Sequence, residues 1–207
     1  MNINFDGKLL PYEYYASNNL LLFNMDCLQA LQYIPNNSID CVITDAPHRK
    51  LKRGAKIRKE QTKYTSGMVS KRGKQLLKYD AIRYDEWLPI IYSKMKDNSH
   101  MYLFVSGSNI CELQTVAENV GFKYQQLIVN DKGYSIASQY YMSSVEFILL
   151  LSKGTRIINN CSSKNLLYYN GVRGYKRHPE ERSRHLIKEF VKNSTDAGDV
   201  VLDLFMR

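Results

Sequence analysis

Residues 39–48 read IDCVITDAPH, a short apolar segment that runs directly into an acidic residue and a proline. The segment 39–44 lacks the strict alternation of a half-exposed strand, and continuous apolar strands are typical of parallel sheets that helices cover on both faces. The segment ends at Asp45. In open α/β sheets, ligands bind beyond the carboxyl ends of the strands. This part of the chain therefore predicts a central strand with candidate site residues at its end.

The rest of the chain continues the pattern of apolar strands separated by helices. Further strands are predicted at residues 20–23, 100–105, 122–129, 145–151 and 200–205, and helices at 28–33, 85–95, 109–119 and 179–192. This alternation predicts an α/β fold with an open, mostly parallel sheet. A length of 207 residues fits one domain over residues 1–207.

Several classes of protein are excluded by composition. The chain has 44% hydrophobic residues, 11 Gly and 5 Pro, so it is neither disordered nor fibrous. It lacks an apolar run of membrane-spanning length and a secretory signal peptide, so we expect a cytoplasmic protein with no membrane partner. Cys27, Cys41, Cys111 and Cys161 have no metal-ligand spacing, so we expect buried, reduced cysteines and no structural metal.

The positive charge is concentrated in one segment. The net charge is +9, and residues 49–83 hold 13 Lys and Arg against Glu60 and Asp80, so the remainder is slightly acidic. Residues 49–79 lack helical or strand periodicity, and we expect a mobile loop that binds the phosphates of a nucleic acid. An ordinary solvated loop is the alternative. The candidate nucleic-acid-binding residues are Lys50, Lys52, Arg53, Lys56 and Arg58.

The sequence Asp45-Ala46-Pro47-His48 resembles the D-P-P-Y motif of the DNA amino-methyltransferases, which transfer a methyl group from S-adenosylmethionine to adenine N6 or cytosine N4. Other segments follow in family order. His178-Pro179 resembles the H-P-T-x-K-P box, and residues 198–206 resemble the G-D-x-V-L-D-P-F-M part of the cofactor motif. The catalytic motif precedes the cofactor motif in this chain, and this order is similar to that of the β group of these enzymes. The resemblance implies a Rossmann-like methyltransferase fold, with adenine N6 favoured over cytosine N4.

The resemblance also implies roles for single residues. Asp45 and the backbone of the motif would accept hydrogen bonds from the amino group of a flipped base, with Pro47 and His48 completing the catalytic motif. His48 replaces the aromatic residue, so we expect weaker base stacking. The candidate cofactor contacts are Asp26, Asp203 and Phe205. A structural alternative for each acidic residue is that it caps the following segment.

The cofactor motif departs from the family pattern, because Arg207 stands at the position of its first Gly. The resemblance also implies that the usual C-terminal cofactor-binding strand and helices are lacking, and with them the ribose-binding acid. We therefore expect S-adenosylmethionine binding to weaken by about 3–6 kcal/mol, or ~10²–10⁴-fold. We also expect either a gap in the sheet between the first and last strands or a pair of exposed edges, filled by self-association, by a complementing subunit or by a rearranged N-terminus.

The favoured function is a methyltransferase-like protein that does not turn over alone and that binds DNA or a protein partner. An active DNA methyltransferase, alone or completed by a second subunit, is one alternative. An RNA-binding or RNA-modifying protein is the other, because charge alone does not distinguish DNA from RNA.

Overall fold

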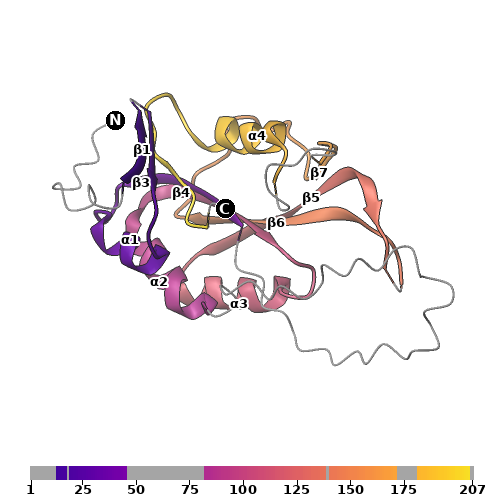
Figure 1. Cartoon of the computed structure of the whole chain (residues 1–207), viewed down its shortest axis with the longest axis horizontal. Helices are drawn as coiled ribbons and strands as arrows, with labels where there is room; N and C mark the ends of the chain where they lie inside the picture. Colours follow the sequence, from indigo (N-terminus) through magenta and orange to yellow (C-terminus); the bar gives the residue numbers. More distant parts are fainter. Residues whose placement is uncertain (1–12, 18, 46–81, 139, 172–180, 206–207) are drawn as a thin grey trace.

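The computed structural model describes residues 13–17, 19–45, 82–138, 140–171 and 181–205 (Figure 1). The strands are β1 (Glu13–Ser17), β2 (Leu20–Phe23), β3 (Ile39–Asp45), β4 (Met95–Val105), β5 (Lys123–Ile136), β6 (Ser143–Lys153), β7 (Leu166–Leu167) and β8 (Val201–Leu202). The helices are α1 (Cys27–Tyr33), α2 (Tyr84–Lys94), α3 (Ile110–Val120) and α4 (Arg184–Ser194).

The main sheet has six strands in the order β7-β5-β6-β4-β3-β8. Neighbouring strands pair in parallel at β3–β4, β3–β8 and β5–β7, whereas β6 is antiparallel to both β4 and β5. Five strands therefore point the same way and β6 runs against them. The predicted open, mostly parallel α/β sheet is confirmed.

Helices cover the two faces of this sheet unequally. Helices α1, α2 and α3 lie on one face and α4 lies on the other (Figure 1). Alternate residues of a strand point to opposite faces of the sheet. Val42 packs on the face covered by α1, α2 and α3, and Cys41 and Ile43 pack on the face covered by α4. Both faces of β3 are thus covered, which explains its continuous apolar sequence.

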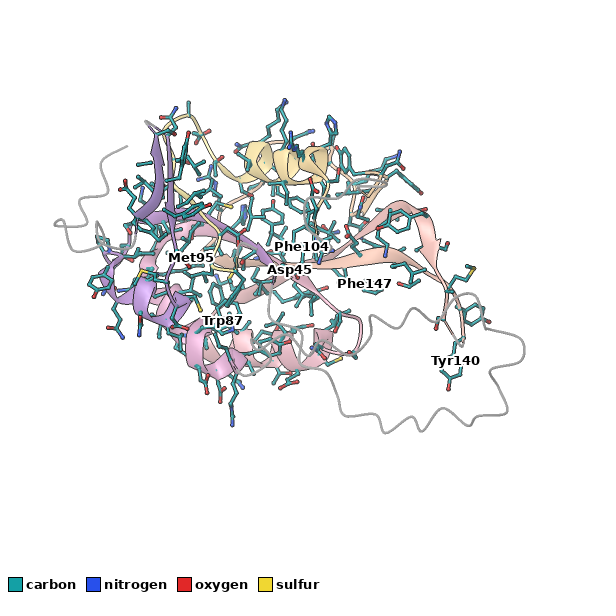
Figure 2. All side chains as sticks on the ribbon, viewed as in Figure 1. Asp45, Trp87, Met95, Phe104, Tyr140 and Phe147 are labelled. Atoms are coloured by element: carbon teal, nitrogen blue, oxygen red, sulfur yellow. The ribbon has the colours of Figure 1, made fainter. Side chains whose placement is uncertain are left out.

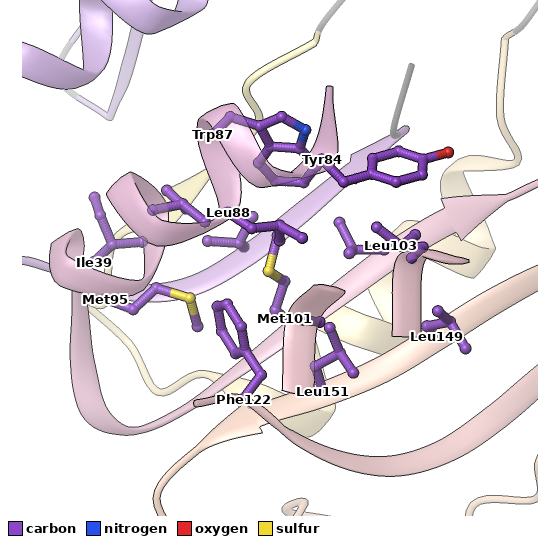
Figure 3. Close-up of a cluster of buried hydrophobic side chains, with 14 of the residues drawn as sticks. Ile39, Tyr84, Trp87, Leu88, Met95, Met101, Leu103, Phe122, Leu149 and Leu151 are labelled. Atoms are coloured by element: carbon purple, nitrogen blue, oxygen red, sulfur yellow. The ribbon is translucent and has the colours of Figure 1, made fainter. Parts of the chain in front are cut away.

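The larger core lies between α2, α3 and the sheet (Figure 3). Trp87 and Leu88 of α2 are fully buried against Met101 and Leu103 of β4. Trp87 also meets Phe205 edge to face, with ring centroids 5.3 Å apart. The contact connects this core to the segment that follows β8.

Two predictions about the first strand are wrong. Leu20–Phe23 does form a strand, but β2 pairs with β1 in a separate two-stranded sheet, and Leu20 and Leu21 are exposed. Because β2 is not a strand of the main sheet, the expected gap between the first and last strands does not exist in that form. Within the described part of the chain, β8 is an edge of the sheet and pairs with β3.

Other boundaries differ from the predicted ones. Strand β8 is shorter than expected because the chain turns at Asp203, whose carboxylate accepts a hydrogen bond from the Phe205 amide at 3.1 Å. Helix α4 begins at Arg184, since the N-cap residue Ser183 is extended. Strands β4, β5 and β6 are longer than predicted, and β1 and β7 were not predicted. The long β5–β6 hairpin carries the exposed Tyr140 near its tip (Figure 2).

The expectation of buried cysteines holds for Cys41, whereas Cys27 is half-buried and Cys111 and Cys161 are exposed. Burial raises the pKa of the Cys41 thiol to about 12. Among the helices of the described residues, none is long and apolar enough to cross a membrane. The predicted basic loop at residues 49–79 lies outside the described residues.

Candidate functional site

Asp45 lies at the end of β3, as the sequence predicted, and β3 pairs with β4. The register pairs Asp45 with Phe104 of β4, and Phe104 pairs with Ile148 of the antiparallel neighbour β6. Because β6 is antiparallel, its beginning lies at the same edge of the sheet as the end of β3. Glu146, near the start of β6, therefore belongs to the same edge as Asp45.

One arginine joins these two carboxylates. Arg182 Nη2 donates to Asp45 Oδ2 at 2.6 Å, and Arg182 Nη1 donates to Glu146 Oε1 at 2.5 Å. The side chains are largely buried, with exposed fractions of 21% for Arg182, 24% for Asp45 and 12% for Glu146. Charge-assisted bonds of this geometry are short and strong.

The guanidinium group of Arg182 lies over the ring of Phe104 in β4, 4.9 Å from the ring centroid, so one face of the group packs on an aromatic ring. Burial alone would lower the pKa of Arg182, but Asp45 and Glu146 together raise it above its ordinary value. Arg182 is therefore a permanent cation of the site.

A second cluster follows β8. The Thr44 hydroxyl donates to Asp203 Oδ1 at 2.6 Å, and the Phe205 amide donates to the same oxygen. The removal of the carboxylate from water raises the pKa of Asp203, and these hydrogen bonds partly oppose the rise. Asp203, Phe205 and Asp45 thus lie at the ends of the neighbouring strands β3 and β8.

Asp26 has a different position. Its Oδ1 accepts hydrogen bonds from the amides of Leu28 at 2.9 Å and Gln29 at 3.3 Å, which makes it the N-cap of α1. The side chain is exposed, beside the two-stranded sheet. The capping role that we considered as an alternative is therefore observed for Asp26.

Pro47 and His48, and the basic residues Lys50, Lys52, Arg53, Lys56 and Arg58, lie outside the described residues. Sequence analysis did not identify Arg182 or Glu146 as site residues. A signal for Arg182 was present, since it stands four residues after His178, where the H-P-T-x-K-P box has its Lys. Glu146 was visible as an acidic residue that interrupts an apolar run.

The chain is similar in sequence to curated type II methyltransferases. The curated relatives include type II methyltransferase M2.DpnII of Streptococcus pneumoniae, 21% identical over 98% of this chain and 82% of the relative. They also include type II methyltransferase M2.MboI of Moraxella bovis, 20% identical over 96% of this chain and 79% of the relative.

Among solved structures, the cytosine-N4-specific PvuII DNA methyltransferase superposes with a TM-score of 0.66 at 16% identity, over 93% of this chain and 76% of that chain. M1.HpyAVI in complex with SAM gives a TM-score of 0.61 at 20% identity, over 87% of this chain and 79% of that chain. These similarities establish a Rossmann-like methyltransferase fold.

The N6/N4 methyltransferase family, described as DNA methylase, matches residues 39–206. This match covers most of the chain, including the strand that ends at Asp45, Glu146 of β6, Arg182 and the turn at Asp203. The chain belongs to the N6/N4 DNA methylase family.

Proposed function

We propose that this chain is a DNA-binding amino-methyltransferase-like protein. It presents Asp45 to the amino group of an extrahelical base, adenine N6 by ancestry, and binds S-adenosylmethionine too weakly to turn over alone. The observation that carries the acceptor side of this proposal is the position of Asp45 at the end of β3, held by Arg182 at 2.6 Å.

The acceptor side requires an amino nitrogen that is oriented by hydrogen-bond acceptors. An ionised carboxylate is purely an acceptor, and so it suits the two N–H groups of an exocyclic amine. Arg182 Nη2 donates to Asp45 Oδ2, so the guanidinium group orients this carboxylate. Asp45 would hold the amino group, and Pro47 and His48 would complete the motif by family resemblance.

The cofactor side fits less well. S-adenosylmethionine supplies the methyl group when bound, and Asp26, Asp203 and Phe205 are the residues that would contact it. However, Oδ1 of Asp26 caps α1, and Oδ1 of Asp203 is bonded to the Thr44 hydroxyl and the Phe205 amide. By family resemblance, Arg207 stands at a glycine of the cofactor motif, and glycine is the residue that suits a tight turn. The hydrogen bonds already made by these two carboxylates, together with the replaced glycine, support weak binding of S-adenosylmethionine.

Nucleic-acid binding is assigned to the basic segment, residues 49–83. Its 13 Lys and Arg against two acids provide the electrostatic attraction that drives binding to phosphates. Duplex DNA is the proposed partner because the relatives are DNA methylases.

One observation favours a second candidate, an active enzyme that works alone or with a complementing subunit. The buried network of Asp45, Arg182 and Glu146 is the kind of preorganised arrangement that catalysis requires. DNA binding alone does not require the carboxylate of Asp45 to be oriented by a buried arginine.

The test compares binding and transfer with one preparation. Fluorescence anisotropy measures binding to a labelled DNA duplex and to an RNA duplex of the same sequence, and labelled S-adenosylmethionine measures methyl transfer to unmethylated phage DNA. We expect tight binding to the DNA duplex and negligible transfer at micromolar cofactor. Rapid transfer by the chain alone would establish the second candidate, and preference for the RNA duplex would contradict DNA as the partner.

A further inference from the structure

Arg182 connects residues that are far apart in the chain. Asp45 is 137 positions and Glu146 36 positions away from it, and β4 lies between the two strands that carry them. Each carboxylate receives its own Nη atom, so both ends of the guanidinium fork are used. A planar fork held at both ends has a fixed orientation, which a single contact would not impose.

The anchor on the Glu146 side is itself rigid. The completely buried Asn130 donates from Nδ2 to Glu146 Oε2 at 3.3 Å and to the carbonyl of Tyr169 at 3.0 Å. Asn130 Oδ1 accepts from the Tyr169 amide at 2.8 Å. A backbone-anchored amide thus holds Glu146, which holds Arg182.

The ring of Phe104 supplies a third point of attachment. It lies on β4 between the two carboxylates and supports the guanidinium group from one face. Within the described residues, the buried Arg182 Nε has no hydrogen-bond acceptor, so the two Nη contacts and the ring determine where the group lies.

We propose that Arg182, anchored by Glu146, is a positioning residue that fixes the side-chain rotamer of Asp45 at the methyl-acceptor site. The catalytic meaning of this role rests on the proposed function, but the structural effect does not. Precise orientation of a reacting group contributes strongly to rate, and a small displacement is costly. Glu146 then acts two steps away from the base, through Arg182.

The direct measurement is the set of three-bond couplings from Asp45 Cγ to its backbone nitrogen and carbonyl carbon, which report the χ1 rotamer by NMR. The variants are Arg182→Met, which keeps an apolar chain over Phe104, and Arg182→Lys, which keeps the charge without the fork. The control is Arg156→Met, because Arg156 is equally buried at 22% exposure and also pairs with an aspartate, Asp196.

We expect one rotamer of Asp45 in the wild type and in Arg156→Met, averaging over at least two rotamers in Arg182→Met, and an intermediate result in Arg182→Lys. A single unchanged rotamer in both Arg182 variants would overturn the proposal. If the Met variant does not fold, the Lys variant is judged by the same criterion.

Catalysis provides a separate readout. In any preparation that transfers methyl groups, Arg182→Met should lower kcat at least tenfold and leave KM for DNA within twofold, with partial recovery in Arg182→Lys. A fall in kcat that Arg156→Met reproduces would contradict a positioning role. The absence of transfer in the wild type would instead count against activity of the chain, and the rotamer measurement would still decide the role of Arg182.

Discussion

Strand β3 carries two aspartates in contrasting roles. Asp45 at its end is bound by Arg182, whereas the buried Asp40 pairs with Lys96 at 2.7 Å and accepts a hydrogen bond from the Val200 amide at 2.9 Å. Asp40 therefore joins β3 to β8 and β4 at the opposite end of the strand. The two residues provide matched substitutions that separate chemistry from stability.

The first prediction concerns Asp45→Asn. The amide offers one acceptor and a competing donor to an amino group, so methyl transfer, where a preparation shows it, should be almost abolished. The cost in stability should be about 1–2 kcal/mol, because one charge-assisted bond is weakened and Arg182 keeps Glu146. Methyl incorporation and urea unfolding measure the two effects.

Asp40→Asn is the control for this experiment. It should lose about 1.5–3 kcal/mol, because the carboxylate is buried and serves two donors, yet it should retain transfer. The role of Asp45 would be contradicted if Asp45→Asn kept its transfer activity and only melted at a lower temperature.

The residues of the site differ in how far sequence could identify them. The position of Asp45 at the end of a strand was predictable, because a local pattern, an apolar segment followed by an acid, indicates it. Arg182 and Glu146 were not identified, because their roles depend on contacts across 36 to 137 positions and on the antiparallel direction of β6. Asp26 is the opposite case. The local sequence made it a candidate cofactor contact, but its side chain caps α1 in the structure.

Helix α4 is attached to the sheet by a buried polar network. The carbonyl of Arg156 can only accept, so His100 Nε2 donates to it at 2.9 Å, and Nδ1 accepts from the Ser194 hydroxyl at 2.8 Å. The Tyr102 hydroxyl then donates to Ser194 at 2.8 Å. This neutral tautomer of His100 joins β4 to the end of α4.

The network predicts a pH dependence of stability. Burial lowers the pKa of His100 below the ordinary 6.5, so the unfolded chain takes up a proton more readily than the folded protein. The contribution is fully present above pH 6.5 and is lost as pH falls from there towards the folded pKa, by at most about 1.4 kcal/mol per pH unit.

Urea unfolding at a series of pH values from neutral to mildly acidic measures this loss. His100→Gln should show a smaller dependence over that range, whereas a Gln substitution of the exposed His185 should behave as the wild type. Equal pH dependence in all three proteins would exclude His100 as the cause.

The strands that sequence predicted best are those whose side chains are buried on both faces of the sheet. Strand β3 and the later parts of β4 and β6 are apolar stretches that helices cover on both faces, and a strand was predicted at each of these stretches. Strand β2 has the same kind of sequence, but its partner is β1, so an apolar segment alone did not determine its sheet. Strand β7 has two residues, too few for any periodicity.

At the scale of the whole molecule, the charge distribution predicts the behaviour towards nucleic acid. Neutralising Lys50, Lys52, Arg53, Lys56 and Arg58 to Gln should weaken duplex binding and reduce the slope of log K against log salt by up to about 4–5, at ~0.9 per phosphate contact. Anisotropy titrations at several salt concentrations give this slope.

Neutralising the exposed Lys123, Lys188 and Lys192 is the control, since they lie outside the basic segment. This second variant should keep most of the affinity and most of the slope. If the two variants lost affinity equally per charge removed, binding would be a property of net charge and not of the basic segment.

We propose that this chain keeps the fold and the acceptor side of an amino-methyltransferase and has a weakened cofactor side. Calorimetric titration of the chain with S-adenosylmethionine tests this claim most directly, because it requires neither a target sequence nor turnover. We expect a dissociation constant approaching the millimolar range, since Oδ1 of each candidate acid, Asp26 and Asp203, is already hydrogen-bonded within the protein. A dissociation constant in the low micromolar range would contradict it.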